Sequence, residues 1–133
     1  MHGFGTEKII LFAGRLVENK GAHVLINAFN EIENSKVNLL LVGGATYSDN
    51  TKTEYIGLLE KLAWKNRDRI LFKGYVNHDE MPELLKIADI FVLPSQVEEG
   101  LPISLIEAMS VGLAVIGSDR GGISDLIEDS ING

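Results

Sequence analysis

The fold is decided by residues 90–109, which read IFVLPSQVEEGLPISLIEAM. Residues 90–93 form a short apolar run, and residues 94–100 are mostly polar and acidic. From Leu105 onward apolar residues return at the spacing of a helix, and Pro102 stands at a natural first-turn position. A buried strand, a polar loop and a helix in direct succession are typical of an α/β domain.

The same unit recurs along the chain. Apolar runs of strand length occur at residues 9–13, 37–42, 70–72, 90–93 and 113–116. Apolar stripes of helical period occur at residues 24–32, 56–63, 81–88, 105–109 and 123–127. Asp79 is the expected N-cap of the third stripe. We therefore expect an α/β fold, a Rossmann-like, doubly wound parallel sheet with helices on both faces.

Composition narrows the class of protein. The chain has 133 residues, no cysteine and a formal charge of -7. It suits one domain, it has no disulfide or cysteine metal site, and it lacks the basic footprint of a general nucleic-acid binder. No apolar run approaches the roughly 20 residues of a membrane span, and no signal-peptide pattern is present. We expect residues 1–7 to be a floppy start or a cloning remnant, and residues 8–133 to be the domain.

The first candidate loop runs from Gly14 to Gly21. Ligands bind such folds at the carboxyl ends of the strands, near the switch in strand order. This loop places Arg15 and Lys20 beside a helix start, which favours phosphate. The alternative is that both are solvated surface cations, as Arg and Lys usually are.

The acidic loop is the second candidate. Glu99 lies in the loop, and Glu107 lies eight residues later in the helix. Carboxylates accept hydrogen bonds from sugar or ribose hydroxyls, and a carboxylate pair can also cleave glycosides. The alternative is two exposed surface acids. Gly121-Gly122, after the fifth run, permits either a close backbone approach to a ligand or a simple turn.

Motifs of several other classes are absent. The chain has no G-x-G-x-x-G dinucleotide motif, no P-loop and no G-x-S-x-G nucleophile elbow. It has no D-x-D pair and no histidine cluster that would suggest a metal site. We interpret His78 as a capping or surface residue, and Tyr47 and Trp64 as ordinary, partly buried aromatic residues.

Taken in order, these segments resemble one family over about residues 8–133. The matching segments are Gly14-Arg15 with Lys20-Gly21, Ala88-Asp89 to Pro94-Ser95, Glu99-Gly100-Leu101-Pro102 through Glu107-Ala108-Met109, and Gly121-Gly122. They are similar to the C-terminal, donor-binding domain of the GT-B glycosyltransferases, in the retaining group called group 1 or family 4. The resemblance implies one half of a GT-B enzyme.

The resemblance also implies a role for each matching residue. Arg15 and Lys20 would bind the diphosphate of a nucleotide-sugar and neutralise it as it leaves, and Glu99 would touch the donor sugar; these three would be catalytic. Glu107 would accept hydrogen bonds from the ribose, and Val76 would lie near the nucleobase. The implied donor-binding set is Gly14, Arg15, Lys20, Val76, Glu99, Gly100, Leu101, Ile103, Ser104 and Glu107. In it, backbone amides around Gly100 and at Ile103 and Ser104 would face the sugar and phosphates. No metal ligand and no cofactor besides the nucleotide-sugar substrate is implied.

The implied reaction is transfer of a hexosyl group from a UDP- or GDP-sugar to an acceptor, with retention. Family enzymes carry an N-terminal acceptor domain and further terminal helices, for which residues 8–133 leave no room. We therefore expect a piece that binds donor without turnover. Its parent would be a cytoplasmic enzyme that could lie against the inner face of a membrane, with no nucleic-acid partner and no membrane segment in this piece.

Two other classes stay open. One is a non-catalytic nucleotide-binding or interaction module, against which the intact Arg15, Lys20, Glu99 and Glu107 argue. The other is a different GT-B enzyme, such as a sugar-nucleotide epimerase or a phosphorylase, since phosphorylases share parts of this site. The segment Gly100-Leu101-Pro102 also departs from the Gly-Phe-Gly that is more frequent in the family, and Pro102 has no N–H to donate.

Overall fold

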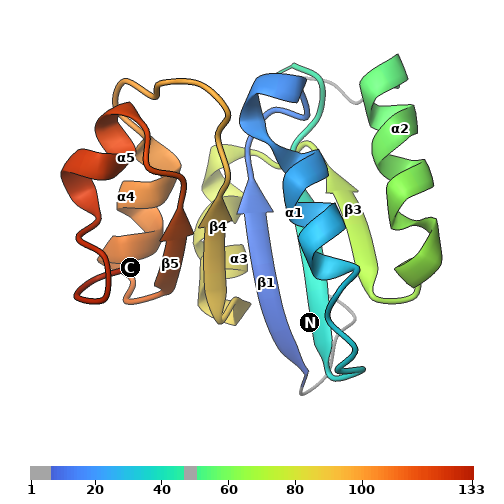
Figure 1. Cartoon of the computed structure of the whole chain (residues 1–133), viewed down its shortest axis with the longest axis horizontal. Coiled ribbons are helices and arrows are strands. Elements are labelled where there is room, and N and C mark those ends of the chain that lie inside the picture. Colours follow the sequence, from blue (N-terminus) through green and yellow to red (C-terminus); the bar gives the residue numbers. More distant parts are fainter. Residues whose placement is uncertain (1–6, 47–50) are drawn as a thin grey trace.

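A single parallel sheet forms the centre of the molecule (Figure 1). The computed structural model describes residues 7–46 and 51–133, so the expected floppy start, apart from Glu7, and Tyr47 lie outside the described residues. The strands of the described part are β1 (Lys8–Ala13), β2 (Val37–Val42), β3 (Ile70–Gly74), β4 (Ile90–Leu93) and β5 (Ala114–Gly117). Their spatial order is β3-β2-β1-β4-β5, and all neighbours are parallel. Every apolar run that predicts a strand is one, with small shifts at the ends.

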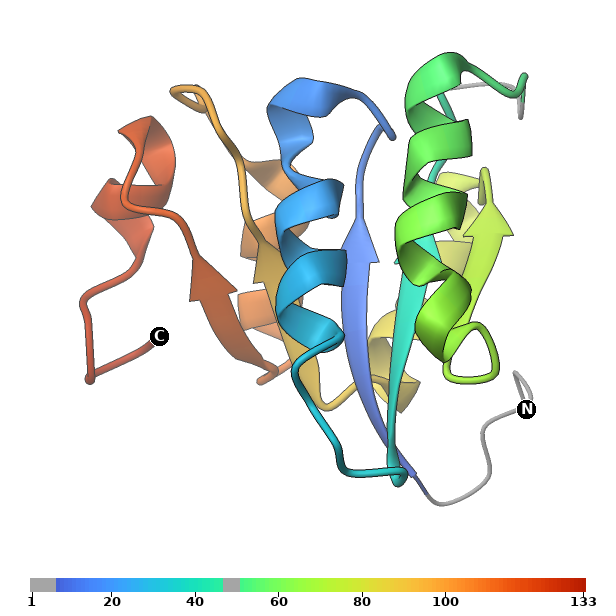
Figure 2. The same cartoon turned by 45° about the vertical axis from the view of Figure 1, so that its right-hand side comes forward.

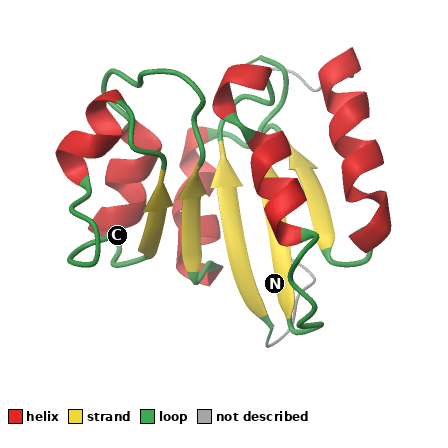
Figure 3. Ribbon diagram, in the orientation of Figure 1, coloured by secondary structure: helices red, strands yellow, loops and turns green. Residues whose placement is uncertain are grey.

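A helix follows each strand, and the helices cover both faces of the sheet (Figures 2 and 3). In the described residues they are α1 (Ala22–Phe29), α2 (Glu54–Ala63), α3 (Met81–Ile87), α4 (Ile103–Ser110) and α5 (Gly121–Leu126). Short 3₁₀ helices adjoin them, namely η1 (Glu18–Lys20), η2 (Trp64–Asn66) and η3 (His78–Glu80). The helical stripes of the sequence therefore predict the right elements.

The sheet separates two hydrophobic cores because successive strand residues point to opposite faces. Phe12 and Leu39 belong to the core beneath α1 and α2, whereas Leu11 and Leu40 belong to the core beneath α3 and α4. All four side chains are fully buried. Burial on both faces is the mark of a doubly wound sheet, so the predicted fold is confirmed. Burial of each such side chain contributes about 1.5–3 kcal/mol to the free energy of unfolding, relative to leaving it exposed.

Two local predictions need correction. Asp79 is not an N-cap, since it lies inside η3, and Asn77 caps this segment in a capping box with Glu80. Both are good capping residues, and the glutamate three positions after Asn77 selects that residue. Pro102 is the N-cap of α4, one position before the first turn. Its carbonyl accepts hydrogen bonds from the amides of Leu105 and Ile106, each at 3.1 Å.

One arginine fastens the edge of the sheet opposite the strand carboxyl ends. The Arg69 guanidinium donates to the carbonyls of Asn34, Val37 and Ile32 and to Asn66 Oδ1, at 2.8–3.1 Å. It also stacks over the Phe29 ring, 4.8 Å from its centroid. The planar guanidinium suits several acceptors at once, so this residue ties the end of α1 to the start of β2.

Candidate functional site

The site lies where the strand order switches, between β1 and β4. From β1 the chain continues to β2 and β3 on one side, and β4 and β5 lie on the other, so the loops after β1 and β4 diverge above the sheet (Figure 1). Such a divergence leaves a crevice at the carboxyl ends of the strands. The two loops are joined at their bases by a hydrogen bond from the Gln96 amide to the Asn19 carbonyl, 2.8 Å.

A cavity of about 470 Å³ opens in this crevice. The sequence-predicted residues that line it are Gly14, Arg15, Lys20, Glu99, Leu101, Ile103 and Ser104. A smaller hollow of about 120 Å³ shares Gly14 and Arg15 with it and is also lined by Val76. The structure thus brings together eight of the ten residues that the resemblance selects, from segments up to ninety positions apart.

Gly100 and Glu107 do not line this cavity. Gly100 is exposed at the tip of the loop. Glu107 lies three residues after Ser104 in α4, so it occupies the same helix face, one turn further from the cavity. The amide of Ile103, which the resemblance implies would face the ligand, donates to the Leu101 carbonyl at 2.9 Å.

An ion pair joins the two loops across the cavity. Lys20 Nζ lies 2.9 Å from Glu99 Oε1 and 3.2 Å from Oε2. The two side chains are only 20% and 13% exposed, so water screens them less than an ordinary surface pair. The Ser95 hydroxyl also donates to Glu99 Oε1. Lys20 therefore contacts Glu99 and also lines the cavity.

The charge state of Glu99 follows from these contacts. Burial alone raises the pKa of its carboxyl group, because a charge is costly away from water. Hydrogen bonds from Ser95 and Lys20, with the charges of Lys20 and Arg15, outweigh burial and hold the pKa below its ordinary value. The carboxylate is therefore ionised at neutral pH and acts as a hydrogen-bond acceptor.

Two glycines let the loops around the cavity pack closely. Gly21 begins α1 with a φ of 79°, and a Cβ at this position would overlap the carbonyl oxygen of Pro94. A Cβ on Gly122 would likewise overlap the carbonyl oxygen of Gly100. The Gly122 amide donates to the Glu99 carbonyl at 2.7 Å. The Gly121-Gly122 segment thus makes a close backbone approach, and its partner is the acidic loop.

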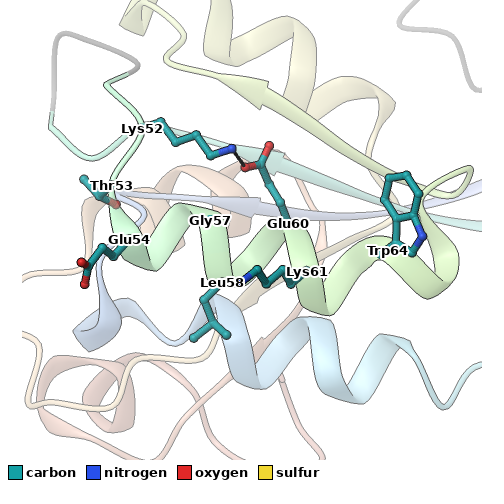
Figure 4. Close-up of a pocket in the computed structure, with 8 residues that line it drawn as sticks. All are labelled: Lys52, Thr53, Glu54, Gly57, Leu58, Glu60, Lys61 and Trp64. Atoms are coloured by element: carbon teal, nitrogen blue, oxygen red, sulfur yellow. Dashed lines mark ion pairs between the residues drawn. The ribbon is translucent and has the colours of Figure 1, made fainter.

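A more extensive hollow lies elsewhere, on the outer side of α2 (Figure 4). It measures about 1020 Å³ and is crossed by an ion pair between Lys52 and Glu60 at 2.8 Å. No predicted donor residue lines it. Trp64 at its rim is 64% exposed, so the expectation of partial burial is wrong. Its ring lies on the outside of the helix end, where the Arg67 guanidinium covers it at 4.1 Å.

Sequence reasoning missed Ser95 and Ser118 as site residues. Ser95 has no exposed surface, and its carbonyl accepts a hydrogen bond from Ser118 Oγ at 2.7 Å. A serine between a buried strand and an acidic loop is the only local signal.

Within residues 7–46 and 51–133 no group of three or more His, Cys, Asp or Glu could hold a metal ion. No helix in the same residues has the length and apolar character needed to cross a membrane.

Comparison with known families identifies the family of the chain. The family model described as "Glycosyl transferases group 1" matches residues 2–133. The chain belongs to this glycosyltransferase family. Spore coat protein SA of Bacillus subtilis (strain 168) is 36% identical over 133 residues, which cover 98% of the chain and 35% of that protein.

Solved structures agree with the family. Anabaena Alr3699/HepE, crystallised with UDP and glucose, superposes with a TM-score of 0.87 at 26% identity, over 98% of this chain and 35% of that one. The C-terminal domain of a group 1 family protein, LpcC of Francisella tularensis, gives 0.82 at 27% identity, over 95% of this chain and 65% of that one. The chain thus spans about a third of the length of the curated relatives that it matches.

Proposed function

We propose that this chain is the donor-binding part of a retaining glycosyltransferase, which transfers a hexosyl group from a UDP- or GDP-sugar to an acceptor. One observation carries the proposal: Arg15, Lys20 and Glu99 line one cavity at the strand switch, with Glu99 ionised. Two cations and a carboxylate match the two ends of a sugar diphosphate. The HepE crystals, which contain UDP and glucose, support the same class of ligand.

Arg15 and Lys20 would act on the leaving group. As the bond between the sugar and the diphosphate breaks, its electron pair passes to the diphosphate oxygen, and negative charge develops there. Fixed cations at that position stabilise the developing charge. We propose that these two residues supply the neutralisation without a metal ion, because both already line the cavity.

Glu99 and Glu107 would orient the donor. Lys20 carries three N–H donors, and its nitrogen lies within hydrogen-bond distance of both Glu99 carboxylate oxygens. A phosphate oxygen in the cavity would share this ammonium with Glu99, so one residue would link the recognition of sugar and diphosphate. Glu99 would accept hydrogen bonds from sugar hydroxyls, and Glu107, one turn along α4, from the ribose.

The activity belongs to a longer protein under this proposal. The curated relatives are about three times the length of the matching region. We propose that the parent supplies an N-terminal acceptor domain, that catalysis occurs between the two parts, and that the parent works in the cytoplasm. This chain alone would bind donor without turnover.

Calorimetric titration with UDP, GDP and ADP, and with their sugar conjugates, tests the proposal. We expect saturable binding of one base, which a sugar strengthens. If a nucleotide binds tightly and its sugar conjugate binds no more tightly, the result would favour a nucleotide-binding module. Absence of binding at millimolar ligand would refute donor binding by this chain, and acceptor-dependent nucleotide release by the chain alone would refute the need for a second domain.

A further inference from the structure

Ser95 is fully buried, although its hydroxyl group makes serine a residue that usually lies at the surface. It follows β4 and Pro94, has no exposed surface, and directs its hydroxyl at Glu99 Oε1. A buried hydroxyl is costly unless it is hydrogen-bonded, so this contact defines where the side chain must stay. Its own carbonyl is held by Ser118 Oγ at 2.7 Å, from the loop after β5.

Glu99 is therefore held from two sides by donors of different character. Lys20, from the loop after β1, contacts both carboxylate oxygens through a long, flexible side chain. Ser95 contacts one oxygen through a short side chain on a buried backbone. The charge of Arg15 also acts on the carboxylate, and the Gly122 amide at the start of α5 donates to the Glu99 carbonyl.

The two donors respond differently to a ligand. A diphosphate in the cavity competes with Glu99 for the Lys20 ammonium, because both are anions within reach of the same group. The Ser95 hydroxyl is buried beneath the loop and does not line the cavity, so a ligand does not compete for it. It is the donor that remains on Glu99 when Lys20 is shared.

We propose that Ser95 is a positioning residue, which keeps the Glu99 carboxylate directed at the sugar while Lys20 is engaged by the diphosphate. The inference rests on the function proposed above, because it assumes that a sugar diphosphate occupies the cavity. It assigns a task to a residue that would touch neither sugar nor phosphate. It also explains why a polar side chain occupies a fully buried position.

The first test measures the Glu99 carboxyl group without any ligand. NMR titration of this group gives its pKa in the wild type and in Ser95→Ala, Ser95→Thr and Ser124→Ala. We expect Ser95→Ala to raise the pKa and Ser95→Thr to restore it. Ser124→Ala is the matched control, since its exposed hydroxyl also donates to a carboxylate, Asp119 Oδ1, but outside the site. A Glu99 titration that Ser95→Ala leaves unchanged would overturn the proposal.

The second test separates sugar from diphosphate. Calorimetry with UDP and UDP-glucose, and with GDP and GDP-mannose, is repeated on the same variants. For the pair that the wild type binds, Ser95→Ala should weaken the nucleotide-sugar by about 3- to 10-fold, the equivalent of one lost hydrogen bond, and the nucleotide alone by less than about 2-fold. Equal losses for both ligands would indicate a merely structural role and refute positioning. A wild type that binds neither pair refutes the proposed function, and the titration still decides whether Ser95 governs Glu99.

Discussion

Replacing Gly21 by alanine tests how closely the loops around the cavity approach each other. Gly21 has a φ of 79°, which L-residues with a Cβ rarely adopt. The new Cβ would also overlap the carbonyl oxygen of Pro94, and it would lie 2.9 Å from the carbonyl carbon. Both effects fall on the junction that holds Lys20 against the acidic loop.

The expected loss of stability combines three contributions. The left-handed backbone costs about 1–2 kcal/mol for an L-residue. Displacing the Pro94 backbone costs about 1–3 kcal/mol, as in an overpacked core. Alanine also makes the unfolded chain less flexible than glycine does, and this effect restores about 0.4–1 kcal/mol of stability. The free energy of unfolding should therefore fall by about 1–5 kcal/mol.

Two matched glycines separate the contributions. Gly112 has a φ of 82° with nothing within 4 Å of its Cβ position, so Gly112→Ala should cost only about 0.5–1.5 kcal/mol. Gly57 lies within α2, and its Cβ would approach only the Lys52 side chain, at 3.8 Å. Gly57→Ala should stabilise by about 0.5–1 kcal/mol.

Urea denaturation followed by circular dichroism measures all three variants. With a slope of about 2 kcal/mol per molar urea, Gly21→Ala should lower the midpoint by about 0.5–2.5 M. A loss no greater than that of Gly112→Ala would refute the close approach of Gly21 to Pro94.

Four further outcomes are expected. Arg69→Ala removes four hydrogen bonds and should lower the free energy of unfolding by about 2–4 kcal/mol. The control Arg67→Ala should change it by less than about 0.5 kcal/mol. Equal losses for the two variants in thermal unfolding would contradict the role of Arg69 in holding this edge of the sheet. Arg15→Ala should weaken nucleotide diphosphate binding by about 1–3 kcal/mol in calorimetry, and unchanged affinity would exclude it from the phosphate site. Chelation with EDTA should leave that binding unaltered, and a loss restored by Mg²⁺ would refute neutralisation by side chains alone. Because the Glu99 pKa is lower in the folded state, its stabilising contribution is complete above the ordinary carboxyl pKa and disappears as the pH falls through the folded value. Urea midpoints across this acidic range should fall less steeply for Glu99→Gln than for the wild type, and parallel profiles would contradict the assigned pKa.

Local sequence patterns predict the elements but not the contacts that unite them. The run Leu39 to Leu41 predicts a strand buried on both faces because an apolar stretch of that length has few alternatives. The choice between Asn77 and Asp79 as a cap is also local, because Glu80 three positions after Asn77 completes a capping box that Asp79 lacks.

The candidate site shows the same division. That Lys20 and Glu99 lie near the ends of strands follows from the order of motifs and strands. Their ion pair joins residues that are 79 positions apart in the sequence. It depends on the strand order, which the apolar runs alone do not predict. The sequence around Arg69 gives no sign of its four acceptors, which come from residues 32–37 and from Asn66. Ser95 lacks any marker of burial apart from the strand before it.

The two neighbours of β1 in the sheet are paired with it to unequal extents. β1 pairs with β2 at six positions, but it pairs with β4 at only two, Ile10 with Ile90 and Leu11 with Phe91. These partners are eighty positions apart, so this pairing closes a long loop and costs more chain entropy than the pairing of β1 with β2. The Lys20–Glu99 pair adds a contact between the loops that follow β1 and β4. A ligand that contacts both loops would therefore stabilise the whole fold as well as fill the cavity.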